Sequence, residues 1–298
     1  MLNSFSYTLH SLFLFAGWTG FNDYSTLNQQ DYNLNWMKSI PDETPVSAIS
    51  IPGTHESLSL YGGPLAVCQV WDLDKQLNVG IRYFDVHAGI WLSVQNHIYI
   101  RDSHWMFWQH IQFDKVLKII FNFLGRNKSE TVLLKIKIHG FFEKKVLQMI
   151  DELIKKFKNK IWTNLSVPNM KQARGKIVLL QSNSFHQGTV NIKSFFIKYD
   201  KLINVEEKIK EYKSHLCNHH VVLTDTAASF HQSPKTLAKT VNKKLNNFVV
   251  EHKKKSVNQE EPQTTTELQT KQDIEKTTEP DSTPEPGPPT SGQDSEPT

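Results

Sequence analysis

The sequence predicts an α/β fold, in which a sheet of parallel strands is covered by helices. Short apolar segments alternate along the chain with longer segments whose apolar residues recur at helical spacing. No glycine-rich phosphate loop of the GxGxxG or GKS type occurs, which disfavours a nucleotide-binding sheet. An open doubly wound sheet and a β/α barrel both fit this alternation. His55, His87 and His104 each follow one of the first three predicted strands, and strand exits meet at the mouth of a barrel. The histidines therefore favour the barrel.

The predicted strands are short segments rich in Val, Ile and Leu, which is typical of strands buried on both faces. They are residues 46–51, 79–86, 98–101, 131–138, 176–180 and 221–224. The predicted helices repeat apolar residues every three or four positions. They are residues 114–124, 144–157 and 234–250, and residues 165–174, which contain Pro168, are a predicted loop.

Composition divides the 298 residues into three parts. Residues 1–20 are a poorly patterned leader, and residues 21–250 carry the aromatic and aliphatic side chains of one folded domain. Residues 251–298 contain no Phe, Trp or Tyr and are rich in Pro, Glu, Thr and Ser, so we expect a disordered tail.

The charge of the chain limits the classes of partner that the sequence supports. The net charge is +4, and the basic segment 155–160 is either a solvated helix face or a surface that attracts anionic lipid. No aromatic-rich basic motif favours nucleic acid.

Cys68 and Cys217 are too few for a disulfide framework. Residues 11–17 resemble the apolar core of a signal peptide, but no Lys or Arg precedes them. We therefore expect a cytoplasmic protein with peripheral membrane association, and we leave secretion open.

Two histidines that face each other across a pocket suit a proton relay, because the pKa of imidazole lies near neutrality. Such a relay fits attack by a hydroxyl on a neighbouring phosphodiester, with cations stabilising the phosphorane. Lys135, Lys137 and Arg174 are the candidate cations. A zinc site that adds Glu56 or Asp85 to the histidines matches no compact zinc motif and ranks lower. A serine nucleophile lacks its Gly-x-Ser-x-Gly elbow.

Four segments, WMKSIPDETPVSAISIPGTHES, QLNVGIRYFDVH, FLGRNKSETVLLKIK and QARGKIVLL, resemble the X domain of phosphatidylinositol-specific phospholipase C. The likeness extends over about residues 21–250 and is greatest to the compact, metal-independent branch. It implies a distorted TIM-type β/α barrel that cleaves phosphatidylinositol to a cyclic inositol phosphate and diacylglycerol. It implies neither a metal nor another cofactor, and it leaves the oligomeric state open.

The resemblance also implies roles for seven residues. His55 is the general base for the inositol 2-hydroxyl, and His104 is the general acid for the glycerol oxygen. The other implied catalytic residues are Asp85, His87 and Glu56. Of these, Glu56 is the implied partner of His104. The implied substrate-binding residues are Lys137 and Arg174, which line the inositol pocket.

The sequence departs from the family pattern at three places. His87 replaces a phosphate-binding arginine and lacks its bidentate fork. Trp105 replaces a glycine. The late aspartate that orients the first histidine has no counterpart, so we expect His55 to lose its tautomer control. The further strands with which the family ends have no counterpart after Val250 either, so the resemblance implies an incomplete barrel. These departures support an alternative, a catalytically impaired relative that binds inositol phosphate head groups or membranes.

The aromatics of residues 104–110 form either a membrane-insertion patch or a packed rim.

Overall fold

The structure is a computed structural model that describes residues 26–62, 66–102, 107–195, 197–198, 201–202 and 221–225, with single positions between 235 and 247. Among the predicted features, the leader, the tail and most of the helix over 234–250 lie outside the described residues. So do His104, Trp105 and Cys217. The limits of the three predicted parts of the chain stay a prediction.

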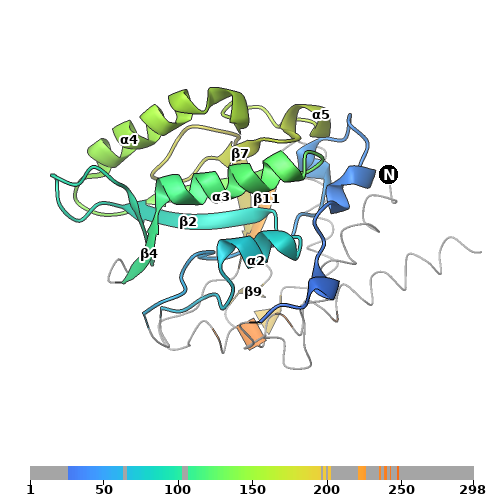
Figure 1. The fold of residues 1–298 in the computed structure, drawn as a ribbon, viewed down its shortest axis with the longest axis horizontal. Helices are drawn as coiled ribbons and strands as arrows, with labels where there is room; N and C mark the ends of the chain where they lie inside the picture. The colour runs from blue at the N-terminus through green and yellow to red at the C-terminus, as the bar shows by residue number, and fades with distance from the viewer. Residues whose placement is uncertain are drawn as a thin grey trace, which may run out of the picture. The chain divides into compact units, whose positions relative to one another are not determined.

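The centre of the fold is a seven-stranded sheet in the order β4-β3-β2-β5-β7-β6, with β1 also paired to β2 (Figure 1). The parallel strands are β1 (Gly53–Thr54), β2 (Tyr83–Gly89), β5 (Val132–Ile138), β6 (Ile161–Trp162) and β7 (Ile177–Leu180). The antiparallel strands are β3 (Tyr99–Arg101) and β4 (Trp108–Gln112). The sheet is therefore mixed, whereas the sequence predicted only parallel strands.

Two small sheets complete the described strands. β8 (Asn191–Phe195) pairs in parallel with β11 (Val221–Asp225). β9 (Ile197–Lys198) and β10 (Lys201–Leu202) form an antiparallel pair. A parallel bridge between Leu180 and Thr189 continues from β7 toward β8.

The described helices are short except for two. The α-helices are α2 (Leu73–Asn78), α3 (Phe113–Arg126), α4 (Glu143–Lys156) and α5 (Met170–Ala173). The 3₁₀ helices are η1 (Gln29–Asp31), η2 (Trp36–Ser39), η3 (Val46–Ala48) and η4 (Lys158–Lys160). Within the described part of the chain, none of them is long and apolar enough to cross a membrane.

Most predicted elements are confirmed within a few residues, one is wrong, and two differ in part. Residues 46–51 begin as η3, because Pro45 and Pro52 flank the segment and cannot donate to a sheet. The second strand starts at Tyr83 and runs to Gly89, so His87 lies within β2 and does not follow it. The predicted loop over 165–174 contains α5, which starts at a capping box formed by Asn169.

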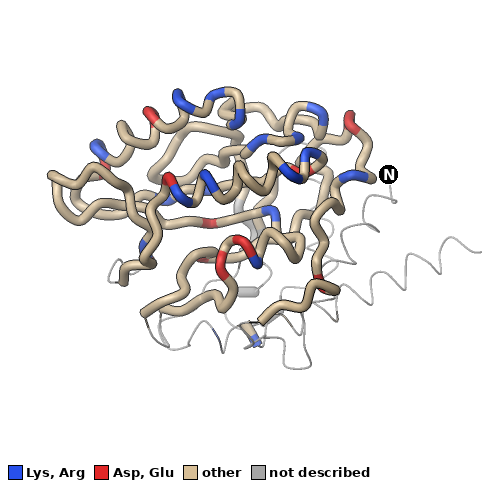
Figure 2. The backbone as a smooth tube through the Cα atoms, viewed as in Figure 1, with Lys and Arg blue, Asp and Glu red and all other residues tan. Residues whose placement is uncertain are grey.

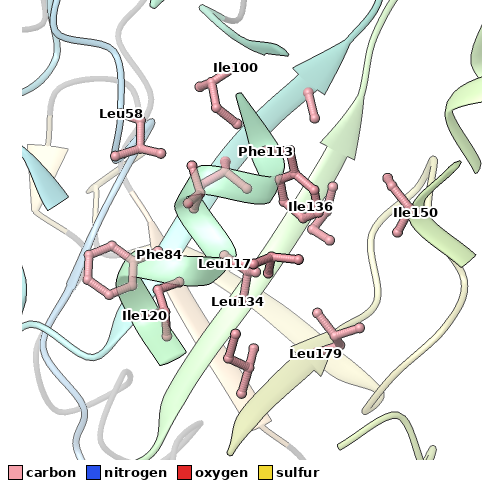
Figure 3. Packing of buried hydrophobic residues seen from close by; sticks show 14 of the residues in the cluster. Leu58, Phe84, Ile100, Phe113, Leu117, Ile120, Leu134, Ile136, Ile150 and Leu179 are labelled. Carbon is pink, nitrogen blue, oxygen red and sulfur yellow. The ribbon is translucent and has the colours of Figure 1, made fainter. Parts of the chain in front are cut away.

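The two faces of β2 and β5 have different surroundings, because successive side chains of a strand point to opposite faces. One face packs against α3 and α4 in the larger core. Figure 3 shows Phe113, Leu117 and Ile120 of α3 against Leu134 and Ile136 of β5. α3 buries this side because its apolar residues form a single stripe.

The other face of the sheet changes character along the strands. Near the amino ends it is apolar, where Leu133, Val178 and Val221 pack against Met37 in the second core. Toward the carboxyl ends, positions 85, 87, 135 and 137 place Asp, His and two Lys side chains on this face. The fold therefore gathers buried charge at the carboxyl ends of β2 and β5.

A buried ion pair fixes the amino ends of the same two strands. Arg82 Nε lies 2.9 Å from Glu130 Oε2, and both side chains are fully buried. The guanidinium also donates to the carbonyls of Leu77 and Leu34. Because these carbonyls belong to segments before β2, the pair ties the chain entering the sheet to β2 and β5.

Candidate active site

The register of three parallel strands brings the first histidine to the buried charges. Asp85 pairs with Lys135, and His87 pairs with Lys137. β1 pairs with β2 so that Thr54 lies opposite Phe84, which places His55 beside Asp85. Parallel strands that end together thus collect residues that are far apart in the sequence.

The carboxylate of Asp85 is the centre of the cluster and is almost fully buried. Its Oδ2 atom lies 2.8 Å from Lys137 Nζ, 3.3 Å from His55 Nδ1 and 3.7 Å from His87 Nε2. Burial alone would raise the pKa of Asp85, but the contacts with His55 and His87 and the charge of Lys137 lower it far below its usual range. Asp85 is therefore an ionised carboxylate at neutral pH.

The turn that carries His55 is tied to β2 by reciprocal hydrogen bonds. The Ser57 amide donates to the Asp85 carbonyl at 2.9 Å, and the Asp85 amide donates to Ser57 Oγ at 2.8 Å. Gln69 Nε2 donates to the His55 carbonyl at 2.8 Å. The His55 side chain stays 29% exposed, so the imidazole is held at its base and accessible at its edge.

Asp85 supplies a carboxylate that the sequence led us to expect His55 to lack. A carboxylate at Nδ1 favours the tautomer that carries its proton on Nδ1 and its lone pair on Nε2. The expected loss of tautomer control stays a prediction, and Asp85, 3.3 Å from Nδ1, is the carboxylate placed to oppose it among the described residues. The partner comes from the neighbouring strand β2, not from a late strand.

Lys137 lies between Asp85 and His87. Its Nζ atom is 3.2 Å from His87 Nε2. This contact ties the Lys137 ammonium to the His87 ring. His87 thus helps to position Lys137, a role different from that of a charged phosphate-binding fork.

His139 belongs to the cluster, although the sequence reasoning did not identify it. Its ring stacks on the ring of His87, with centroids 4.8 Å apart. Burial, together with the electrostatic effect of His87 and Lys137, lowers the pKa of His139 to about 4. His139 is one residue past the end of β5, and that position after a strand was the only available signal.

Glu56 follows His55 in a conformation that is rare for a residue with a side chain, with a φ of 42°. Its buried Oε1 atom lies 3.7 Å from His55 Nε2, and its Oε2 atom accepts from Ser59 Oγ at 3.1 Å. Cys68 Sγ lies 3.6 Å from the same Oε2 atom. Burial and the Glu56 charge raise the pKa of Cys68, so this free thiol stays protonated.

Not all predicted residues come together. Lys135 is buried and donates to Asn191 Oδ1 at 3.2 Å. Arg174 precedes β7 and binds at the amino ends of the strands, where it pairs with Asp42 at 2.8 Å and donates to the Met37 carbonyl. The structure therefore does not bring Arg174 to the cluster of Asp85 and Lys137.

The aromatic segment near the predicted mouth is described only in part. Trp108 packs against Tyr99, with centroids 4.6 Å apart, and against the Arg101 guanidinium at 4.7 Å. Phe107 is 37% exposed. For Trp108 the packed-rim reading holds, and the remaining part of the segment lies outside the described residues.

A metal ion would need several ligands in one place. Among the described residues, no group of three or more His, Cys, Asp and Glu side chains is arranged to hold one. The arrangement of His55, Asp85 and Lys137 instead offers an imidazole base, a carboxylate that orients it and a cation for an anionic substrate.

Comparisons with known proteins show which proteins this chain resembles. Residues 43–183 match the family model described as phosphatidylinositol-specific phospholipase C, X domain. A 1-phosphatidylinositol phosphodiesterase of Listeria monocytogenes is 29% identical over 245 residues, which cover 72% of this chain and 75% of the relative. A protein of the same name from Staphylococcus aureus strain Newman is 28% identical over 159 residues, or 49% of each chain.

Solved structures show the same fold. The phosphatidylinositol-specific phospholipase C of L. monocytogenes superposes with a TM-score of 0.61 at 27% identity, covering 76% of this chain and 90% of that one. A mutant of the S. aureus phospholipase gives a TM-score of 0.51 at 19% identity, covering 72% and 84%, and supports the fold alone. The predicted α/β fold of the TIM-barrel type is confirmed, and its incompleteness stays a prediction.

Proposed function

Residues 43–183 belong to the X-domain family of phosphatidylinositol-specific phospholipase C, and on that premise we propose that this chain cleaves the phosphodiester bond of phosphatidylinositol. One observation carries the proposal. A buried, ionised Asp85 contacts both the accessible His55 and Lys137, at 3.3 and 2.8 Å. That arrangement prepares a base and a cation at the same place, as cleavage of a phosphodiester by a neighbouring hydroxyl requires.

The proposed reaction begins at His55. Asp85 holds the Nδ1 proton, and the Nε2 lone pair accepts the proton of the inositol 2-hydroxyl. The hydroxyl oxygen then forms a bond to phosphorus, and the bond from phosphorus to the glycerol oxygen breaks. His104, whose role rests on the family resemblance, gives its proton to that oxygen. The products are a cyclic inositol phosphate and diacylglycerol, and the step leaves His55 with one more proton and His104 with one fewer.

Lys137 is the proposed electrostatic element. Its side chain is 22% exposed while its ammonium contacts the buried Asp85 carboxylate, so we propose that this charge is also accessible to a substrate. Negative charge that develops on the phosphorane is stabilised by a cation already fixed in place. Asp85 and His87 supply that fixation. Arg174 has no part in this proposal, because it is engaged at the other end of the strands.

The test is a direct assay of the full chain. Phosphatidylinositol vesicles are incubated with the protein, and phosphorus NMR follows the cyclic inositol phosphate. We expect product from the wild type, and a loss of about a thousandfold or more in His55→Ala and in His104→Ala. His186→Ala, which changes an exposed histidine outside the cluster, is the matched control and should retain full activity. Absence of product from the wild type, or undiminished product from His55→Ala, would refute the proposal.

A second candidate function is head-group binding without turnover. It is favoured by the engagement of Lys137 on two sides, by Asp85 and by His87, which limits how far its charge can serve a substrate. Wild-type protein that binds phosphatidylinositol vesicles but forms no product would favour this candidate. In either case we propose that membrane contact is peripheral, because the scissile bond lies at the level of the lipid head groups.

A further inference from the structure

Arg101 is a buried arginine on β3, the strand that lies next to β2. β3 pairs with β2 in antiparallel register, and Arg101 lies directly opposite His87. Residues directly opposite in such a pair project from the same face of the sheet, with Cβ atoms about 4.5–5.5 Å apart. Arg101 therefore shares the face of the sheet that carries Asp85 and His87. It flanks His87 on one side, and Lys137 of β5 flanks it on the other.

The packing of β3 agrees with this orientation. Ile100, the residue before Arg101, pairs with Ala88, and both belong to the larger core on the α3 side of the sheet. Because successive side chains of a strand point to opposite faces, Arg101 points away from that core. Its side chain is nevertheless only 1% exposed. The guanidinium is thus enclosed on the face of the candidate active site and not in the apolar core.

Two tryptophan rings hold this guanidinium in place. Its Cζ atom lies 4.9 Å from the centroid of the Trp91 ring and 4.7 Å from that of the Trp108 ring. Trp108 pairs with Arg101 across β3 and β4 and also packs against Tyr99, with ring centroids 4.6 Å apart. Aromatic faces attract a cation through their quadrupole and carry no formal charge. The rings therefore fix the position of the Arg101 charge without neutralising it.

Asp102 is the acidic group that acts on Arg101. Between Asp85 and Arg101 the sequence has no charged residue, and Figure 2 shows the loop after β2 without one. Asp102 Oδ1 accepts a hydrogen bond from the Phe107 amide at 2.9 Å, so its carboxylate is shared with the backbone. Burial lowers the pKa of Arg101 and the charge of Asp102 raises it. A guanidinium stays charged at neutral pH in either case, so Arg101 is a buried cation.

The candidate active site needs more positive charge than Lys137 provides. Oxygen atoms of Asp85 and Glu56 lie 3.3 and 3.7 Å from the two ring nitrogens of His55. Lys137 contacts Asp85, which takes up part of its charge. A phosphodiester is itself negative, so the carboxylates oppose its approach unless another cation lies nearby. Arg101 meets that need, and salt screens a buried charge less than an exposed one.

We infer that Arg101, together with Lys137, supplies the positive charge that attracts the phosphate group of the substrate. This inference rests on the proposed function for the identity of the substrate. Trp91 and Trp108 keep the charge of Arg101 on one side of His87, and Asp85 keeps that of Lys137 on the other. The phosphate group is then drawn toward the carboxyl end of β2, between the two cations.

The test compares an anionic ligand with its neutral counterpart. NMR titration of the full chain gives the dissociation constants of inositol 1-phosphate and of inositol. Arg101→Met removes the charge but keeps an unbranched side chain against the rings. It should weaken binding of inositol 1-phosphate about tenfold, as expected for a unit charge within about 10 Å at an effective dielectric constant of about 20. Binding of inositol should not change. Arg101→Lys keeps the charge and should stay within about threefold of the wild type.

Arg126→Met is the matched control, since Arg126 is exposed at the end of α3, shortly before the amino end of β5. It should leave both dissociation constants unchanged. If circular dichroism shows that Arg101→Met does not fold, Trp91→Ala decides, because the Trp91 ring is 48% exposed and the fold does not depend on it. Loss of this ring should weaken binding of inositol 1-phosphate about threefold and leave that of inositol unchanged.

Cleavage of phosphatidylinositol vesicles is measured on the same proteins, so that failure of this inference and failure of the proposed function are distinguished. Wild-type protein that forms no cyclic inositol phosphate, but binds inositol 1-phosphate in a way that depends on Arg101, would end the proposed function and support this inference. If the wild type cleaves the lipid, Arg101→Met should lower kcat/KM about tenfold, for the same electrostatic reason.

Three results would overturn the inference. The first is an unchanged affinity for inositol 1-phosphate in Arg101→Met or, where that variant does not fold, in Trp91→Ala. The second is an equal loss of affinity for inositol 1-phosphate and for inositol, which would give Arg101 a structural role alone. The third is wild-type protein that binds inositol 1-phosphate no more tightly than inositol, because no positive charge would then act on the phosphate group.

Discussion

Replacement of Asp85 by asparagine tests the cluster most sharply, because it removes one charge and keeps the shape of the side chain. The carboxylate contacts His55, His87 and Lys137. Asparagine can present its amide nitrogen to His55, in which case the wrong tautomer is stabilised. It also leaves the imidazolium that forms during the reaction without a counter-charge.

The magnitude follows from the distance. Two unit charges 3.3 Å apart attract by about 5 kcal/mol at an effective dielectric constant of about 20. Lys137 shares the same carboxylate oxygen, so only part of this attraction is available to His55. A loss of about 3–4 kcal/mol in transition-state stabilisation corresponds to a decrease in kcat of about two to three orders of magnitude.

The assay is the initial rate of cyclic inositol phosphate formation by Asp85→Asn and by the wild type. Because the pKa of Asp85 lies far below its usual range, the carboxylate stays charged between about pH 5 and 9, and the deficit should be constant over that interval. Asp114→Asn removes a carboxylate from a surface pair with Lys118 and should retain full activity. A rate for Asp85→Asn within threefold of the wild type would show that the contact with His55 has no role in catalysis.

Three further predictions concern the scaffold. Glu130→Ala leaves the fully buried guanidinium of Arg82 without its carboxylate and should lower the free energy of unfolding in urea by about 3–5 kcal/mol. A change below about 1 kcal/mol would contradict the role given to the ion pair of Arg82 and Glu130. The pKa of His139 is lowered to about 4, so its stabilising contribution is complete above the ordinary value near 6.5 and is lost as the pH falls toward 4. His139→Gln should therefore lessen the loss of stability between pH 6.5 and 4, and identical pH dependence in both proteins would refute this. Gly188→Ala places a Cβ atom 2.4 Å from a backbone oxygen at a φ of 101° and should lower the free energy of unfolding, measured by thermal unfolding, by about 1–3 kcal/mol. Gly125→Ala in α3 meets no atom within 4 Å and should be neutral or stabilising. Equal effects of the two substitutions would refute the assignment of strain to Gly188.

Local sequence predicted the elements whose stability is local in origin. The apolar stripe of α3 and the continuous apolar run of β5 are readable from periodicity and side-chain type. The polar helix α2 was missed because its sequence, LDKQLN, carries little periodic signal, although Asp72 caps it. β4 was missed because aromatic and polar residues alternate irregularly, and its pairing with β3 supplies the stability. Such elements depend on tertiary partners.

The same distinction explains the candidate site. Asp85, His87 and Lys137 could be predicted because alternation along two adjacent strands places them on one face. His139 could not, since its stacking on His87 depends on how the chain leaves β5. Arg174 lies next to a strand in the sequence, but it precedes that strand, so it belongs to the end of the sheet opposite the charged cluster.

The most direct test of the account is whether the substrate supplies its own nucleophile. A phosphatidylinositol whose inositol 2-hydroxyl is methylated has no proton for His55 to accept and no oxygen free to attack phosphorus. Presented in the same vesicles as the natural lipid, it should release no diacylglycerol, while the natural lipid yields cyclic inositol phosphate. Release of diacylglycerol from the methylated lipid at a comparable rate would mean that water attacks phosphorus, and the role proposed for His55 and Asp85 would be wrong.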